Sequence, residues 1–136
     1  MASIKELIRS EADQSLSFGD YERPEKGKKA DFEFQGDIYE IKTFCEITKL
    51  ERNGAFTYES VPGTVVTEFR LTDDGMEFTA EGPEDAQITV GLEPDSEYSV
   101  RENGQDLGIM ETNLGGKLVF SLELSQGKKT IQLVKQ

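Results

Sequence analysis

The stretch TVVTEFRLTDDGMEFTA, Thr64–Ala80, decides the fold class of this 136-residue chain. Apolar and polar residues alternate along its first half, so one face of a predicted strand carries Val65, Thr67, Phe69 and Leu71. The opposite face carries Val66, Glu68 and Arg70. The pair Asp74-Gly75 is typical of hairpin turns, and the alternation resumes after it at Met76, Phe78 and Ala80. The stretch therefore predicts an antiparallel β-hairpin.

The same alternation extends through most of the chain. Near the C-terminus it involves Leu118, Phe120, Leu122 and Leu124, and it returns in Lys129–Lys135 after Gln126-Gly127, which predicts a C-terminal hairpin. Turns are also predicted at Gln35-Gly36-Asp37, Arg52–Ala55 and Asn103-Gly104. The four prolines all fall between strand candidates. These patterns predict an all-β protein, an antiparallel β-sandwich of jelly-roll or immunoglobulin-like type.

The length suits one domain covering residues 1–136, and we leave open two stacked β-subdomains that meet near Val61-Pro62-Gly63. Two segments depart from the strand pattern. Ala2–Arg9 has the apolar spacing of a short helix, and Tyr21–Ala30 is the best candidate for a loop. The basic cluster in that loop, Arg23–Lys29, is interpreted as solvated, with anion binding as the alternative.

The net charge is −12, with 27 acidic and 15 basic residues. Such a charge repels nucleic-acid backbones and anionic membrane surfaces, and it favours solubility. The single cysteine, Cys45, excludes an intrachain disulfide, and its apolar neighbours predict a buried, unreactive thiol within a strand. With no signal-peptide pattern and no apolar membrane span, we expect a cytoplasmic protein.

The sequence contains no histidine, which removes the most common general base and most zinc sites. We therefore predict no catalytic residues, no metal site and no cofactor. The adjacent acids Asp73-Asp74 and Glu84-Asp85 are interpreted as turn residues, with a carboxylate pair for glycoside hydrolysis as the alternative. Calcium binding at Asp73–Gly75 or Glu81–Asp85 is a weaker alternative, since neither segment has EF-hand spacing.

The segment Leu92–Val100, with the spacing Leu-x-Pro-x-x-x-Tyr-x-Val, resembles the turn that enters a late strand in fibronectin type III and related sandwiches. The resemblance covers about residues 79–125. It implies that Tyr98 is a corner tyrosine, whose ring lies on the core and whose hydroxyl bonds to the backbone upstream, with Leu92 as its apolar neighbour. The segment Thr112–Phe120 is similar to closing strands of accessory domains in carbohydrate-active enzymes.

The whole chain also resembles a family of small, uncharacterised all-β proteins from anaerobic gut bacteria of the Clostridia type, some of which are labelled endosialidase. The stretches that carry this resemblance are Leu7–Asp13, Ser17–Tyr21, Glu46–Glu51 and Tyr58–Thr64. The family brings no catalytic residues to this chain. Recognition of a sialic-acid carboxylate requires clustered guanidinium groups, whereas the five arginines are scattered at Arg9, Arg23, Arg52, Arg70 and Arg101.

Three functional hypotheses follow. The first is a non-enzymatic protein that acts by contact with another protein or by self-association, as a homo-oligomer and with a dimer favoured, because many short strands leave sheet edges exposed. The second is a carbohydrate-binding module, for which Tyr21, Tyr39 and Tyr58 are the candidate aromatic platforms, although each also fits a half-buried strand position. The third is a glycoside hydrolase, which would need two facing acids and an arginine in one pocket. The sequence identifies no binding residues beyond these candidates.

Overall fold

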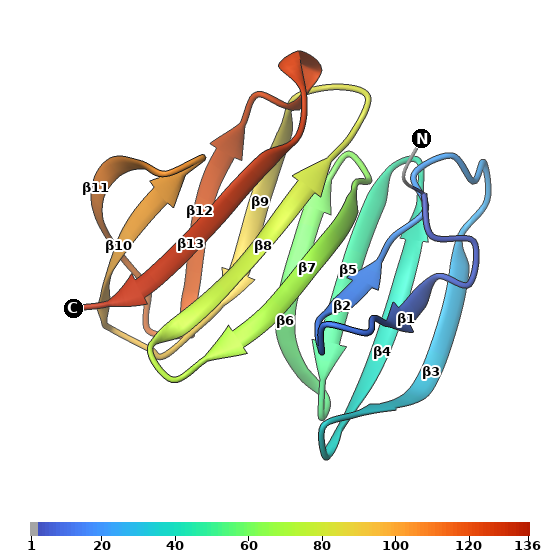
Figure 1. Cartoon of the computed structure of the whole chain (residues 1–136), viewed down its shortest axis with the longest axis horizontal. Coiled ribbons are helices and arrows are strands. Elements are labelled where there is room, and N and C mark those ends of the chain that lie inside the picture. Colours follow the sequence, from blue (N-terminus) through green and yellow to red (C-terminus); the bar gives the residue numbers. More distant parts are fainter. Residues whose placement is uncertain (1–2) are drawn as a thin grey trace.

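A computed structural model describes residues 3–136 and shows two antiparallel sheets packed face to face as a β-sandwich (Figure 1). The first half of the chain contains β1 (Ile8–Ser10), β2 (Leu16–Phe18), β3 (Gly27–Phe34), β4 (Asp37–Phe44), β5 (Ile47–Arg52) and β6 (Ala55–Val61). The second half contains β7 (Val65–Thr72), β8 (Gly75–Glu81), β9 (Ala86–Gly91), β10 (Glu97–Glu102), β11 (Gln105–Glu111), β12 (Lys117–Leu122), the short 3-10 helix η1 (Leu124–Gln126) and β13 (Lys129–Lys135). The predicted fold class is confirmed.

The seven-stranded sheet has the order β1-β2-β7-β8-β13-β10-β11, and the six-stranded sheet has the order β12-β9-β6-β5-β4-β3. Strands from either side of Val61–Gly63 pair in both sheets, β2 with β7 in one and β6 with β9 in the other. The two halves of the chain therefore share both sheets. Among the described residues, no helix has the length and apolar character needed to span a membrane.

Aromatic rings join the two sheets at the centre of the core. Tyr58 on β6 meets Phe18 on β2 and Phe78 on β8, both edge to face and both at 5.4 Å between ring centroids. All three side chains are buried. Edge-to-face contacts of this kind contribute about 0.5–1.5 kcal/mol each beyond the burial of apolar area. Tyr58 therefore connects the six-stranded sheet to two strands of the other sheet.

A buried network of hydroxyl groups surrounds the connection between β6 and β7, where the chain crosses from one sheet to the other. The Thr64 hydroxyl lies 2.9 Å from the Tyr58 hydroxyl and 2.8 Å from that of Ser60. The Thr48 hydroxyl donates to the Thr64 carbonyl at 2.8 Å and accepts from the Thr64 N–H at 3.1 Å. Burial raises the pKa of Tyr58 to about 12, so its hydroxyl stays protonated at neutral pH. The network holds the start of β7 against β5 and β6.

The corner at Tyr98 forms as predicted. The Tyr98 ring is buried, and its hydroxyl accepts a hydrogen bond from the backbone N–H of Glu93, five residues upstream, at 3.1 Å. Leu92 is partly buried against the core. The segment between β9 and β10 is thus fixed to the sandwich by a side chain of the strand that follows it.

Several predicted features of the chain are wrong. A bulge in β7 leaves both Val66 and Phe69 in the core and Leu71 exposed, because Glu68 adopts φ 55° and shifts the alternation by one residue. Val65 is buried on the other side of the sheet, against Ile4 and Tyr21.

The predicted C-terminal hairpin does not form either, because β12 pairs with β9 in one sheet and β13 pairs with β8 and β10 in the other.

Cys45, predicted to be buried in a strand, is exposed in the turn between β4 and β5, and this turn has no glycine or asparagine to signal it. Residues 3–9 form no helix, and Gly27–Ala30 belong to β3 and not to the predicted loop. The predicted hairpin turns at Gln35, Asn53, Asp74 and Asn103 are all present.

Replacing Thr64 with valine tests the hydroxyl network. The substitution removes the partner shared by two buried hydroxyls, and we expect the free energy of unfolding to fall by about 1–3 kcal/mol. Urea denaturation at constant m-value measures the loss, with Thr72→Val at the exposed end of β7 as the control. Equal stability of the two variants would contradict the role given to Thr64.

Tyr98→Phe removes one hydroxyl and leaves the Glu93 N–H without that partner. We expect a loss of about 1 kcal/mol in the free energy of unfolding. Tyr39→Phe is the matched control, since the Tyr39 hydroxyl has no hydrogen bond within residues 3–136. A larger loss in the control than in Tyr98→Phe would contradict the assignment of the corner.

Candidate binding groove

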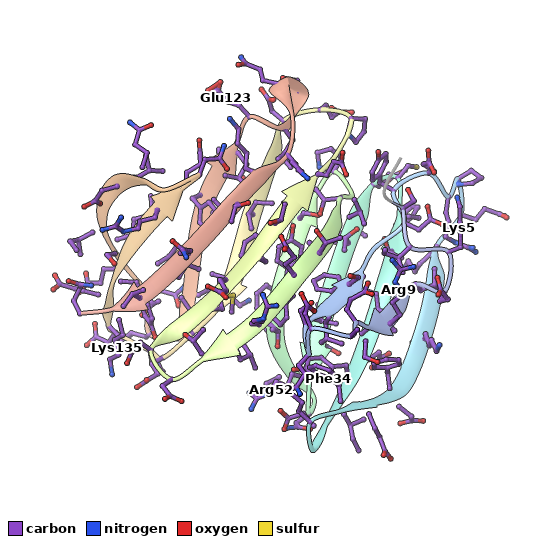
Figure 2. The ribbon with its side chains drawn as sticks, in the orientation of Figure 1. Lys5, Arg9, Phe34, Arg52, Glu123 and Lys135 are labelled. Atoms are coloured by element: carbon purple, nitrogen blue, oxygen red, sulfur yellow. The ribbon has the colours of Figure 1, made fainter. Side chains whose placement is uncertain are left out.

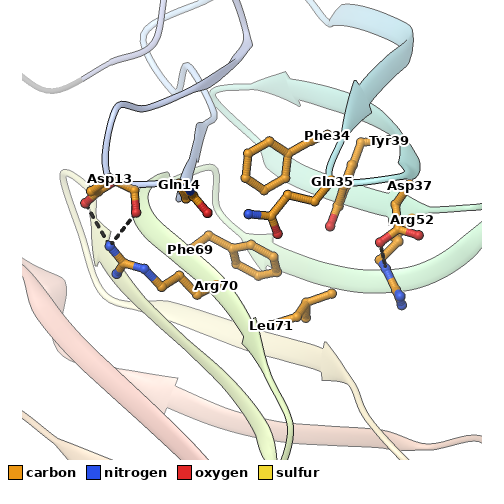
Figure 3. Close-up of a pocket in the computed structure, with 10 residues that line it drawn as sticks. All are labelled: Asp13, Gln14, Phe34, Gln35, Asp37, Tyr39, Arg52, Phe69, Arg70 and Leu71. Carbon is orange, nitrogen blue, oxygen red and sulfur yellow. Dashed lines mark hydrogen bonds and ion pairs between the residues drawn. The ribbon is translucent and has the colours of Figure 1, made fainter.

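A cavity of about 360 Å³ opens at one end of the sandwich, where connections from both sheets meet (Figure 3). It lies between the β1–β2 connection, the β3–β4 turn, β4, the end of β5, and β7. Figure 2 shows Phe34 and Arg52 at this end of the molecule. Its lining combines charged, amide and apolar side chains: Asp13, Gln14, Phe34, Gln35, Asp37, Tyr39, Arg52, Phe69, Arg70 and Leu71.

Two arginine–aspartate pairs stand on opposite sides of the cavity (Figure 3). Arg70 Nη2 lies 2.8 Å from Asp13 Oδ2, and Arg52 Nε lies 2.8 Å from Asp37 Oδ2. Each aspartate has a second support, since Asp13 accepts from the Ser15 hydroxyl at 2.6 Å and Asp37 accepts from the Asn53 amide at 2.9 Å. The four charged groups are therefore held in place while their outer atoms remain accessible.

These contacts also set the protonation of the two acids. The hydrogen bond from Ser15, together with Arg70, lowers the pKa of Asp13, and the hydrogen bonds from Arg52 and Asn53 lower the pKa of Asp37. Both carboxylates are ionised at neutral pH, and within the lining their charges cancel those of the arginines, while Arg70 also pairs with Glu77 of β8 at 3.8 Å. The cavity thus offers fixed donors and acceptors without a net charge.

Two glutamines bring amide groups to the cavity. Gln14 has φ 65° and Gln35 has φ 51°, both in the left-handed region that non-glycine residues rarely adopt. Figure 3 shows the Gln35 side chain between the two ion pairs. Within the described part of the chain, neither side-chain amide has a hydrogen-bond partner. Each amide is therefore available to donate to and accept from a ligand.

The apolar part of the lining is mostly closed to solvent. Phe69 and Tyr39 are only 1% and 2% exposed, whereas Phe34 is half-buried and meets the Tyr39 ring edge to face at 6.4 Å. Phe34 is thus the aromatic ring that the cavity presents most openly. Leu71, which is exposed because of the β7 bulge, provides a second apolar contact.

The residues that the sequence pointed to are mostly elsewhere. Tyr21, Tyr39 and Tyr58 are buried, so none of them forms an open aromatic platform. Asp73-Asp74 lies in the β7–β8 turn and Glu84-Asp85 in the β8–β9 connection, where Asp85 accepts hydrogen bonds from Ser125. Over residues 3–136, no group of three or more Asp, Glu or Cys side chains is placed to hold a metal ion.

The five arginines are not all scattered, which corrects the sequence-based expectation. The fold brings Arg52 and Arg70 to the same cavity. Arg9 pairs with Glu11 at 2.7 Å, the Arg23 side chain donates to the carbonyl of Glu25, and Arg101 is exposed on β10. The basic cluster around Arg23 does not converge on one site, since Lys28 pairs with Glu40 of the neighbouring strand at 3.3 Å.

Sequence reasoning missed Asp13, Gln14, Phe34, Gln35 and Asp37 as site residues. One local signal was present, because three turns within residues 3–136 have positive φ at both central residues, and two of them use Asn-Gly while the third uses Gln35-Gly36. Asparagine is the favoured residue there. Glutamine is less favoured than asparagine at such a position, and here its side chain lines the cavity.

Comparisons of the chain with protein-family models, with curated proteins and with solved structures gave no match. The resemblances to fibronectin-type sandwiches and to proteins of gut bacteria therefore stay predictions.

The charge state of the cavity can be measured directly. A carboxyl group whose folded pKa is depressed stays ionised until the pH falls through that depressed value. We expect Asp13 and Asp37 to titrate below the usual aspartate pKa of 3.8 in carbon-detected NMR. Arg52→Ala should move the Asp37 titration upward and leave Asp13 unchanged. A titration of either wild-type carboxyl above the usual value would contradict this assignment.

Proposed function

We propose that the protein is a non-catalytic binding domain whose cavity takes a neutral, hydroxyl-rich ligand, namely a carbohydrate. The observation that carries the proposal is the placement of two charge-neutral arginine–aspartate pairs on either side of the unpartnered Gln35 amide. Adjacent sugar hydroxyls donate and accept at the same time. They match a surface on which guanidinium and amide N–H groups alternate with carboxylate and amide oxygens.

The apolar groups fit the same ligand class. A pyranose ring has a C–H face without hydroxyls, and the half-buried Phe34 ring and the exposed Leu71 offer apolar area for such a face. Small-molecule sites commonly combine apolar walls with a few fixed polar groups. This platform replaces the one expected from Tyr21, Tyr39 and Tyr58.

Two observations favour binding over hydrolysis. A glycosidase needs one carboxyl group that is protonated at working pH, with a raised pKa. Asp13 and Asp37 both have lowered pKa values and are each engaged by an arginine. The same pairing argues against a sialic-acid substrate, because the guanidinium groups are already neutralised and the chain carries a net charge of −12.

Binding to a panel of neutral and sialylated oligosaccharides, measured by calorimetry, tests the proposal. We expect neutral glycans to bind, with Gln35→Ala and Arg52→Ala each weakening affinity about tenfold or more through loss of hydrogen bonds. Arg101→Ala, outside the groove, is the control. Thermal denaturation verifies that each variant is folded. Preferential binding of sialylated glycans, or equal affinity in all variants, would contradict the proposal.

Self-association remains a second candidate, and β11 favours it. This strand forms one edge of the seven-stranded sheet, and its bulge next to Gly108 leaves Leu107 and Ile109 49% and 53% exposed. Two other edges are protected, since β1 has three residues and β3 is interrupted by a bulge at Asp31, while β12 is the remaining edge, with Val119 exposed. Contact between two β11 edges would shelter these apolar side chains in a dimer.

Light scattering over a range of protein and salt concentrations tests the dimer. Two copies that each carry −12 repel one another, so we expect association to increase with ionic strength as the repulsion is screened. Ile109→Lys should abolish the dimer, whereas Val119→Lys, at an equally exposed position on β12, should not. A monomeric mass under all conditions would remove this candidate.

The cellular location of the protein is also a proposal. Cys45 is the single cysteine and its thiol is exposed in a turn. A reducing environment keeps such a thiol free, so we retain the cytoplasm as the proposed location.

A further inference from the structure

The cavity belongs to a longer groove along the same end of the sandwich. A neighbouring hollow of about 350 Å³ shares Arg52 and Leu71 with it and continues to Glu93 and Tyr98. A third hollow, formed by residues 33–38, shares Phe34, Gln35 and Asp37 with it. The cavity thus shares lining residues with two neighbouring hollows.

We infer that this groove binds the interior of a linear, neutral polysaccharide chain, with the Arg52–Asp37 pair between two successive sugar-binding subsites. The inference rests on the proposed carbohydrate binding and specifies its ligand. Its structural basis is the continuity of the hollows: Arg52 lines the first two, and its partner Asp37 lines the first and the third. A single closed pocket would instead select a small free sugar or a chain end.

The groove runs along the connections at one end of the sandwich. The β3–β4, β5–β6 and β7–β8 turns and the β9–β10 connection all lie at the lower end in Figure 1. The sheets beneath them supply a rigid base, and Tyr98 fixes the β9–β10 connection through its bond to Glu93. An extended ligand can follow this row without a rearrangement of the strands.

The second hollow differs from the first in its chemistry. The Phe56 ring lies there, but Lys117 Nζ is 4.6 Å from its centroid, so this ring is already engaged by a cation. Thr57, Thr72 and Glu93 supply the polar groups, and Glu93 is paired with Lys135 at 2.9 Å. The first hollow, with its unpartnered amides, should therefore contribute most of the affinity, and the second should extend it.

Affinity as a function of chain length distinguishes an open groove from a closed pocket. The probes are ladders of cello-, xylo-, manno- and malto-oligosaccharides from the monosaccharide to the hexasaccharide, measured by calorimetry with the full chain. For the ladder that binds best, we expect the affinity to rise about tenfold or more from the disaccharide to the hexasaccharide. A fluorescent label at the reducing end of the hexasaccharide should leave its affinity unchanged, because the interior of the chain occupies the groove.

A blocking variant locates the second subsite. Thr72 is exposed and lines the second hollow, so Thr72→Trp should reduce hexasaccharide affinity to the level of the short oligomers and leave disaccharide affinity unchanged. Thr72→Val is the folded control without the added bulk. Equal affinities for the disaccharide and hexasaccharide, or loss of binding on end-labelling, would overturn the groove while carbohydrate binding stands. Failure of every ladder to bind would overturn both.

Discussion

The structure depends on the contact that Tyr58 makes across the sandwich. Its ring contacts Phe18 and Phe78 of the opposite sheet. Its hydroxyl is hydrogen-bonded to that of Thr64, in the segment where the chain crosses from one sheet to the other. A buried hydroxyl needs a partner, so the ring cannot move toward the core without breaking that bond. One residue therefore fixes both the spacing of the sheets and the position where β7 begins.

The geometry of the groove follows from the same packing. β7 starts at the Thr64 network, and its bulge at Glu68 brings Phe69 back to the core while Arg70 and Leu71 reach the cavity. Asp13 then meets Arg70 because β2 pairs with β7, with Leu16 opposite Phe69. On the facing sheet, β4 and β5 pair Tyr39 with Arg52, which places Asp37 beside the guanidinium group. Strand register thus positions Asp37, Arg52 and Arg70, and the β1–β2 connection brings Asp13 to Arg70.

Local sequence signals predicted those features that local interactions determine, namely the strands, the tight turns and the tyrosine corner. Alternation and the Asp74-Gly75 and Asn103-Gly104 pairs gave the strands and their hairpins, and the Tyr98 spacing gave the corner. The bulge in β7 and the separation of β12 from β13 depend on long-range pairing, which periodicity does not contain. The groove was not predictable for the same reason, since Asp13 and Arg70 are 57 positions apart in the chain.

The two glutamines of the cavity connect its backbone conformation to the proposed ligand. Asn53-Gly54 and Asn103-Gly104 have the asparagine that sterics favour in such turns, and each asparagine side chain also accepts a backbone hydrogen bond, from Ile38 and Thr130. Gln35 occupies an equivalent backbone position, and Gln14 is left-handed in a different turn, yet both line one cavity. Glutamine gains nothing for the turn over asparagine, but its side chain is one methylene longer. At Gln35 this longer side chain lines the cavity with an amide that has no hydrogen-bond partner within residues 3–136, and this is the group that the proposed carbohydrate site uses.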